Sequence, residues 1–320
     1  MSVDEPREVM PLRLLVPPEC AGWRLDHFLR SRVRRLSRTR IQNIIGEQVR
    51  FPDGRRVRPA SSVRGGETIV LDRPAPPDPD VPRYFDVIAT DPDFYVLNKP
   101  AGLPIHTTAK FWKNTVTWLL RERFPDENVQ VCHRIDRETS GLLLVARGLR
   151  AASVLKQAFA NRKVSKRYLA LVRGIPVPGV GVIDRPMRLL DTPTNLTMGV
   201  APDGVPSVTR YEVIRRFAQH ALLACSPETG RQHQIRVHLA SIGHPIVGDK
   251  LYGAGEREFM QFCDEGMSPA LLAVFDGLER HALHAERLTF AHPRTFDPVT
   301  FECPLPDDLT RYIAGLSDEQ

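Results

Sequence analysis

A proline-rich segment divides this chain and most constrains how it can fold. Residues 73–82 contain five prolines in ten positions. Proline fixes φ and lacks an amide donor, so this stretch cannot continue a helix or enter the interior of a sheet. Such composition is typical of a stiff, extended linker. We therefore predict two domains, 12–73 and 84–310, joined by a linker over 74–83, which agrees with a length of 320 residues.

The first predicted domain carries more than the whole net charge of the protein. The chain has a net charge of +6, whereas residues 24–73 contain 13 Arg, no Lys and 5 Asp or Glu, which gives +8 and leaves about −2 for the rest. Concentrated positive charge indicates a surface that binds a polyanion. Arginine rather than lysine favours bidentate contact with phosphate. The alternative is a solvated, charged helix face.

The apolar pattern of this basic segment predicts two helices and short strands. Apolar residues recur at helical spacing over 25–33 and again over 41–45. Ser37 is a candidate N-cap for the second helix, and Gly46 is its expected end. Short strands are expected around the turn Asp53-Gly54 and near the end of the segment, over 48–51, 56–57 and 68–71.

This order of elements, with the segment IQNIIGEQVRFPDGRRVRPASSVRGGETIVL at its centre, resembles the small RNA-binding domain first seen in a small-subunit ribosomal protein. The resemblance covers about 50 residues. It implies a small α+β domain in which Arg38, Arg40 and neighbouring arginines contact RNA phosphates. Such contacts give affinity and position the RNA but read little of its sequence.

The larger segment mixes helix and strand patterns. Helices are predicted over 115–124, 149–161 and 231–242, the last ended by Gly243. Strands are predicted over 84–89, 94–97, 142–146, 167–172, 207–214, 221–225, 287–290 and 299–303. Residues 254–280 have no clear pattern and are expected to form a helical insertion. Because strands and helices do not alternate regularly, we predict an α+β fold with a mainly antiparallel, mixed sheet rather than a doubly wound parallel sheet.

Composition argues against several other classes of protein. The five cysteines are scattered without a Cys-x-x-Cys pair, and the ten histidines form no H-E-x-x-H motif. We therefore expect neither a disulfide framework nor a metal site. No apolar run approaches the length of a membrane span, and residues 1–10 carry acids and prolines rather than a signal peptide. The sequence thus predicts a cytoplasmic protein that does not contact a membrane.

The run CHRIDRETSG at 132–141 is the first motif that points to chemistry. It places Asp136 between Arg134 and Arg137, and nearby positive charge lowers the pKa of a carboxyl group and keeps it ionised. An ionised, held carboxylate suits nucleophilic chemistry at a sugar carbon. A surface loop with ordinary ion pairs is the alternative.

Two further motifs lie downstream. In KRYLALV, at 166–172, Tyr168 is the polar aromatic on one strand face, suited to stacking on a base or relaying a proton, or else an ordinary core tyrosine. In ETGRQHQIRVHL, at 228–239, a turn leads into a helix on which Gln232 and Arg236 share a face. This junction is a candidate anion-binding site. The alternative is a solvated helix face with His233 and His238 as surface groups.

At this point four ordered segments, LNKPAGLPIH, HRIDRETSGLLLVA, KRYLALVRG and TGRQHQIRVHLASIGHPIVGDKLYG, resemble the large bacterial family of RNA pseudouridine synthases that act on ribosomal and transfer RNA. The likeness runs from about Tyr84 to Pro306, nearly the whole second domain. One position departs from the family pattern, because Ile135 stands where leucine usually precedes the aspartate.

The resemblance implies roles for the motif residues. Asp136 is the catalytic aspartate, which attacks the anomeric carbon of the sugar or the uracil ring, or promotes elimination at the sugar. Arg236 pairs with Asp136 and keeps it ionised and oriented. Tyr168 stacks on the uracil and takes the proton from ring carbon 5. The isomerisation conserves atoms, so no redox cofactor, nucleotide or metal is expected.

Further residues are assigned to RNA binding. The target nucleotide must leave the stacked helix, and Arg134 is expected to fill the vacated space, because a guanidinium is a planar cation that stacks. Arg231 and Gln234 are also assigned to RNA. The expected partner is ribosomal RNA, with transfer RNA as an alternative, and the protein is expected to be a monomer.

Two other functions compete with the isomerase hypothesis. A non-catalytic RNA-binding protein, such as a chaperone of ribosome assembly, explains the positive charge but not the set Asp136, Tyr168 and Arg236. A hydrolase that removes the base uses the same carboxylate, but the sequence offers no candidate group to activate water on the opposite face of the sugar.

Overall fold

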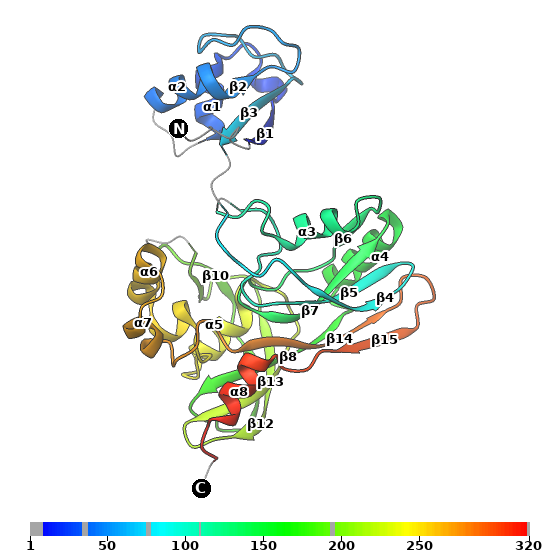
Figure 1. Cartoon of the computed structure of the whole chain (residues 1–320), viewed down its shortest axis with the longest axis vertical. Coiled ribbons are helices and arrows are strands. Elements are labelled where there is room, and N and C mark those ends of the chain that lie inside the picture. The colour runs from blue at the N-terminus through cyan, green and yellow to red at the C-terminus, as the bar shows by residue number, and fades with distance from the viewer. Residues whose placement is uncertain (1–8, 34–37, 75–77, 109, 193–195, 319–320) are drawn as a thin grey trace, which may run out of the picture. The chain divides into compact units, whose positions relative to one another are not determined.

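A computed structural model describes residues 9–33, 38–74, 78–108, 110–192 and 196–318 (Figure 1). The chain divides into two compact units, Met1–Asp78 and Pro79–Gln320, and each has its own hydrophobic core. Among the described residues, no helix is long and apolar enough to span a bilayer.

The first unit packs two helices on a small antiparallel sheet. The elements are β1 (Val9–Leu15), η1 (Pro18–Cys20), α1 (Leu25–Arg32), α2 (Arg38–Gln48), β2 (Val49–Arg50) and β3 (Thr68–Pro74). The strand order is β1-β3-β2. The helices bury the apolar residues that the sequence pattern marked, among them Phe28 and Ile45, each fully inaccessible to solvent.

Two expectations for this unit were wrong, and one strand was not predicted. Gly46 lies inside α2 rather than at its end, because one glycine costs only about 1 kcal/mol in a helix and the buried Ile41, Ile44 and Ile45 outweigh that. Residues 56–57 are not in a strand. Strand β1 was not predicted; it contains Pro11, which an edge strand tolerates. Ser37 lies outside the described residues.

The described part of the second unit is built on one ten-stranded sheet with the order β4-β5-β7-β14-β8-β13-β12-β9, with β6 added on β7 and β15 on β14. Its strands are β4 (Asp86–Thr90), β5 (Phe94–Lys99), β6 (Val129–Val131), β7 (Ser140–Arg147), β8 (Ser165–Arg173), β9 (Val180–Asp184), β12 (Val208–Arg216), β13 (His220–Pro227), β14 (Leu283–Ala291) and β15 (Pro298–Glu302). A hairpin of β10 (Met187–Leu189) and β11 (Met198–Val200) stands apart. Only the β7–β14 pairing in this sheet is parallel. The predicted α+β class with a mainly antiparallel, mixed sheet is confirmed.

The second unit also contains six α-helices among its described residues. They are α3 (Val116–Arg123), α4 (Leu149–Ala160), α5 (Gln234–Ser241), α6 (Glu256–Glu265), α7 (Pro269–Val274) and α8 (Asp307–Ala314), with a π-helical turn η2 (Lys250–Ala254). The expected helical insertion is therefore present as α6 and α7 (Figure 1). Helix α5 begins three residues later than the pattern predicted. In α4 the first residue, Leu149, is 68% exposed, whereas Ala151, Ala152 and Leu155 are buried.

A close approach of two backbones fixes the start of β7. Gly141 has φ +105°, and a Cβ there would lie 2.3 Å from the carbonyl oxygen of Ala285 in β14. Only glycine meets both conditions. This contact pins the loop 132–139, which contains Asp136 and leads into β7, against the middle of the sheet.

Candidate active site

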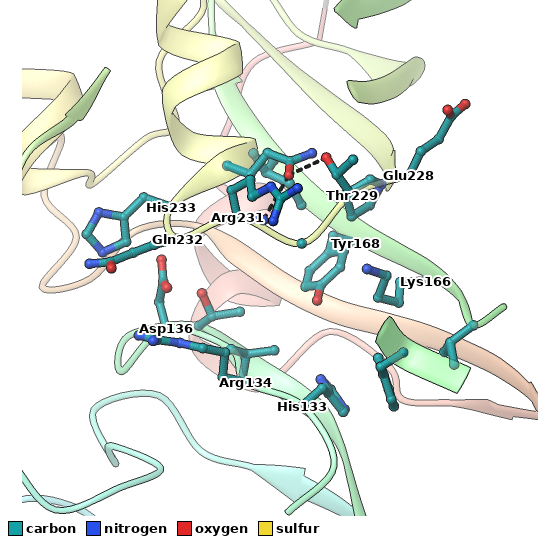
Figure 2. Close-up of a pocket in the computed structure, with 18 of the residues that line it drawn as sticks. His133, Arg134, Asp136, Lys166, Tyr168, Glu228, Thr229, Arg231, Gln232 and His233 are labelled. Carbon is teal, nitrogen blue, oxygen red and sulfur yellow. Dashed lines mark hydrogen bonds between the residues drawn. The ribbon is translucent and has the colours of Figure 1, made fainter. Parts of the chain in front are cut away.

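A cleft of about 400 Å³ opens where the loop before β7 faces the segment between β13 and α5. Residues within 132–139, 159–168 and 227–236 line it, together with Leu283. Figure 2 shows Asp136, Tyr168 and Lys166 in this cleft, with Arg231, Gln232 and His233 on the facing segment. The volume is within the range of small-molecule sites and is large enough for a single nucleotide.

Asp136 is held by an arginine 100 residues away in the sequence. Arg236 Nη1 donates to Asp136 Oδ2 at 3.0 Å. The same guanidinium donates from Nε and Nη2 to the two carboxylate oxygens of Asp249, at 2.6 and 2.9 Å. The side chain of Asp249 is fully buried, whereas that of Asp136 is 17% exposed and faces the cleft. One buried cation therefore lies between a hidden carboxylate and an accessible one.

These charges keep Asp136 ionised. Burial would raise the pKa of Asp136, but positive charge on His233 and His281 when they are protonated, and on Arg236 throughout, lowers it, and the net direction is downward. Burial also lowers the pKa of His233 to about 4 and that of His281 to about 3. Both imidazoles are thus neutral near pH 7, so Arg236 is the cation that acts on Asp136 there.

The expectation that Arg134 and Arg137 hold Asp136 was wrong. Arg137 pairs with Glu138 at 3.2 Å and lies over the ring of Phe111. Arg134 is exposed at the cleft. Among the described residues, the ion pair of Asp136 is made with Arg236, so the neighbours in sequence did not identify the cation that holds this carboxylate.

A second set of buried polar contacts supports the loop from behind. Lys250 Nζ donates to Glu138 Oε1 at 2.7 Å, and the hydroxyl of Thr139 lies 2.8 Å from His281 Nε2. The rings of Phe262 in α6 and Phe275 after α7 cover the Lys250 ammonium, with centroids 4.9 and 6.0 Å away. The helical insertion therefore shields from water the ion pair that fixes the residue two positions after Asp136.

Tyr168 comes from β8 and is 8% exposed where it lines the cleft. Burial, and then the charge of Asp136, raise the pKa of its phenol. The hydroxyl therefore stays protonated near neutral pH and is a weak base. The environment favours stacking on a base over removal of a proton.

Gln234, which was assigned to RNA, lines the cleft but uses its side-chain amide within the domain. Its side chain is 4% exposed. Its Oε1 accepts from the Thr229 hydroxyl at 2.7 Å and from the Arg231 amide at 3.0 Å, and its Nε2 donates to Val208 and Thr209, each at 2.9 Å. With every polar atom of its side chain used inside the domain, Gln234 shapes the loop before α5. Arg231 itself is exposed at the cleft.

Comparison with known proteins agrees with this geometry. Residues 93–241 match the model of the family described as RNA pseudouridylate synthase. A protein of Xanthomonas campestris pv. campestris, named ribosomal large subunit pseudouridine synthase D, is 37% identical over 98% of this chain and 95% of its own length. The chain belongs to the RNA pseudouridylate synthase family. It is an RNA pseudouridine synthase, an isomerase that converts uridine to pseudouridine.

Other relatives of this synthase extend the likeness to experimental structures. A protein of Chloroflexus aurantiacus, named an uncharacterized RNA pseudouridine synthase, is 37% identical over 95% of this chain and 93% of its own length. The structure of human RNA pseudouridylate synthase domain containing 1 superposes with a TM-score of 0.56 at 27% identity, covering 76% of this chain and 100% of that one.

Two residues of the synthase site were missed from the sequence. Asp249 and Tyr252 both lie in the segment GDKLYG. Tyr252 packs its ring on the Arg236 guanidinium, with the centroid 4.9 Å away, and its hydroxyl lies 2.8 Å from His233 Nδ1. The one signal in the sequence that could have indicated them is that both are polar residues in the segment that follows the predicted helix 231–242. His238 is also buried, between Thr209 and the carbonyl of Arg185, and is not a surface group.

One group among the described residues of the synthase has the side-chain types of a metal site. Ligand atoms of Asp91, Asp93 and His292 lie within 4.8 Å of one another. Asp93 pairs with Arg294 at 2.8 Å, and His292 Nε2 lies 3.3 Å from Asp91. The group does not line the cleft, and its own ion pairs account for its arrangement.

The two arginines assigned to RNA in the first unit both lie in α2. Arg40 is exposed, whereas the side chain of Arg38 lies outside the described part of the chain.

Proposed function

We propose that this synthase modifies uridines of large-subunit ribosomal RNA and that Asp136 is its catalytic carboxylate. The substrate class is supported by relatives from Xanthomonas and Vibrio, 37% and 34% identical, whose names specify the ribosomal large subunit. The observation that carries the catalytic assignment is the ion pair of Asp136 with Arg236 at the wall of a nucleotide-sized cleft.

The proposed chemistry begins when the target nucleotide leaves the RNA stack and enters the cleft, because a stacked base cannot be detached and turned. Asp136 attacks the sugar carbon C1′ or the uracil ring, or promotes elimination at the sugar. On each route the C1′–N1 bond breaks and a C1′–C5 bond forms. Any bond that Asp136 has formed to the substrate breaks again as the C1′–C5 bond forms. The C5 proton passes to water and N1 takes up a proton from water, so the reaction balances without a cofactor.

The other cleft residues have supporting roles in this proposal. Arg236 keeps Asp136 ionised and directed into the cleft. Tyr168 stacks on the uracil. Arg134, exposed at the mouth, fills the space that the nucleotide leaves in the RNA. Arg231 contacts the RNA backbone, since a guanidinium matches phosphate geometry.

The basic first unit serves as an RNA clamp in this proposal. Arg38 and Arg40 lie in α2 of a unit whose segment 24–73 has a charge of +8. Replacement of both by alanine should weaken RNA binding. The slope of log K for RNA against log salt concentration should become smaller in magnitude by about one for each phosphate contact that is lost. The rate at saturating RNA should not change. We further propose that the synthase acts as a cytoplasmic monomer.

Tritium release from RNA labelled at uracil carbon 5 tests the proposed function. The RNA is taken from cells that lack the synthase and is separated into large-subunit ribosomal RNA and transfer RNA. The wild-type protein should release tritium from the ribosomal fraction, and the folded Asp136→Asn variant should release none. Full turnover by Asp136→Asn would refute the catalytic assignment, and release from transfer RNA alone would refute the substrate.

The same assay separates the competing functions. A base-removing hydrolase would liberate free uracil, which is detected by chromatography of the products. A protein that only binds RNA would release neither tritium nor uracil from any fraction while still retaining RNA on a filter.

A further inference from the structure

The cleft is lined by one lysine, Lys166, as well as by arginines, and the proposed reaction gives this lysine no role. Lys166 lies two residues before Tyr168 in β8. Side chains two apart on a strand point to the same face, and both residues line the cleft. In Figure 2 the Tyr168 ring lies between Asp136 and Lys166. In this view, Lys166 and Asp136 lie on opposite sides of the Tyr168 ring, and all three side chains line the cleft.

The Lys166 ammonium has no counter-charge among the described residues. Glu228, the acidic residue on the facing loop, pairs with Arg210, and Asp136 pairs with Arg236. Burial lowers the pKa of Lys166. A cation that gives up hydration without a partner is costly, so its position in the cleft calls for a ligand with electron-rich oxygen.

The position of Lys166 indicates which oxygen that is. If the sugar carbon lies at Asp136 and the uracil ring stacks on Tyr168, the ring extends from the carboxylate toward Lys166. Of the two carbonyl oxygens of uracil, O4 lies on the edge of the ring opposite N1, away from the sugar, whereas O2 lies next to N1. Lysine offers three donors and no acceptor, and therefore suits a carbonyl oxygen.

We propose that Lys166 is a further catalytic residue, whose ammonium donates a hydrogen bond to a carbonyl oxygen of the flipped uracil. When the C1′–N1 bond breaks, its electron pair passes to the uracil and spreads over N1, O2 and O4. Lys166 keeps its proton and stabilises this charge until the C1′–C5 bond has formed. Donors aimed at developing charge contribute to rate more than to binding. This inference rests on the proposed function.

Single-turnover kinetics with Lys166→Met tests the proposal. The substrate is an oligoribonucleotide containing the uridine located by the tritium assay. At saturating enzyme we expect the rate to fall about a hundredfold, with the Kd for RNA unchanged and with partial recovery in Lys166→Arg. The matched control is Lys163→Met, because Lys163 is exposed three residues earlier and does not line the cleft.

Sulfur substitution at the target base then assigns the contact. A thiocarbonyl accepts a weaker hydrogen bond, so 2-thiouridine or 4-thiouridine should slow the wild-type enzyme, and one of the two should cause no further loss in Lys166→Met. That pair of results identifies O2 or O4. Equal slowing in both enzymes would overturn the contact.

The remaining outcomes also decide the question. An unchanged rate in folded Lys166→Met would overturn the proposal. A loss confined to RNA affinity, with the salt slope reduced by about one, would show that the ligand is a backbone phosphate and would equally overturn it. Absence of turnover by the wild-type enzyme would count against the proposed function instead.

Discussion

Replacement of Asp249 by asparagine should damage this synthase in two ways that can be measured separately. The substitution keeps the shape of the side chain but removes the buried charge that faces Arg236. Two hydrogen bonds, at 2.6 and 2.9 Å, join the pair, and the Asp249 side chain is fully buried. Breaking a buried ion pair by removing one partner costs about 3–5 kcal/mol, which is the expected loss of unfolding free energy.

Asp136→Asn is the matched comparison, because it removes the other carboxylate from the same guanidinium. Asp136 is partly exposed and makes one bond to Arg236, at 3.0 Å. An asparagine oxygen still accepts that bond, so we expect a loss of only about 1 kcal/mol. Urea denaturation followed by circular dichroism at pH 7 measures both values. Asp249 is therefore expected to matter more for stability, and Asp136 more for turnover.

The catalytic effect of Asp249→Asn follows from the freed guanidinium. With its hidden partner gone, Arg236 no longer holds Asp136 in one place, and misplacement of a reacting group by about 1 Å costs about a hundredfold in rate. The loss should fall on kcat, with KM for RNA little changed. The reasoning would be refuted if the unfolding free energy of Asp249→Asn lay within about 1 kcal/mol of the wild-type value, or if Asp249→Asn and Asp136→Asn lost equal amounts of unfolding free energy.

Two further predictions concern the frame of the site. Gly141→Ala should lower the free energy of unfolding by about 3 kcal/mol, because the added Cβ would lie 2.3 Å from the Ala285 carbonyl oxygen. Gly148 also has a positive φ but has open space around it, so Gly148→Ala should lower the free energy of unfolding by only about 1 kcal/mol. Equal losses for the two variants in urea titrations would contradict the clash at Gly141. Burial lowers the pKa of His281 to about 3, below that of an unfolded histidine, so stability is lost as pH falls below about 6.5, by about 2 kcal/mol at pH 5. His281→Gln should lack this contribution, and an unchanged pH dependence would count against it.

Local patterns in the sequence predicted the elements of this protein better than the contacts between them. Apolar periodicity located both helices of the first unit and the strands around the site, because periodicity reports which side of an element is buried. Pairing across the sheet was not predictable in this way. Strand β14 lies between β7 and β8 although about 110 residues separate it from β8, and no local signal specifies such a partner.

The same limit applies to the site. The motif around Asp136 identified the carboxylate, but its cation was expected from neighbours in sequence and comes from Arg236 in α5. Gln234 was assigned to RNA from its place in a polar run, whereas its amide is used to hold the loop. A polar residue at the start of a helix can bind a ligand such as RNA or can hold the preceding loop by hydrogen bonds. The two roles are distinguished by how buried the side chain is, which the sequence does not give.

The place of β14 has a consequence for when the enzyme becomes active during its synthesis. Residues 283–291 form a central strand, parallel to β7 and antiparallel to β8. Until that segment has left the ribosome, β7 and β8 each present an unpaired edge, and Gly141 has no strand to pack against. Residues 283–291 must therefore leave the ribosome before the cleft can form, and a nascent chain that stops before them is expected not to modify RNA.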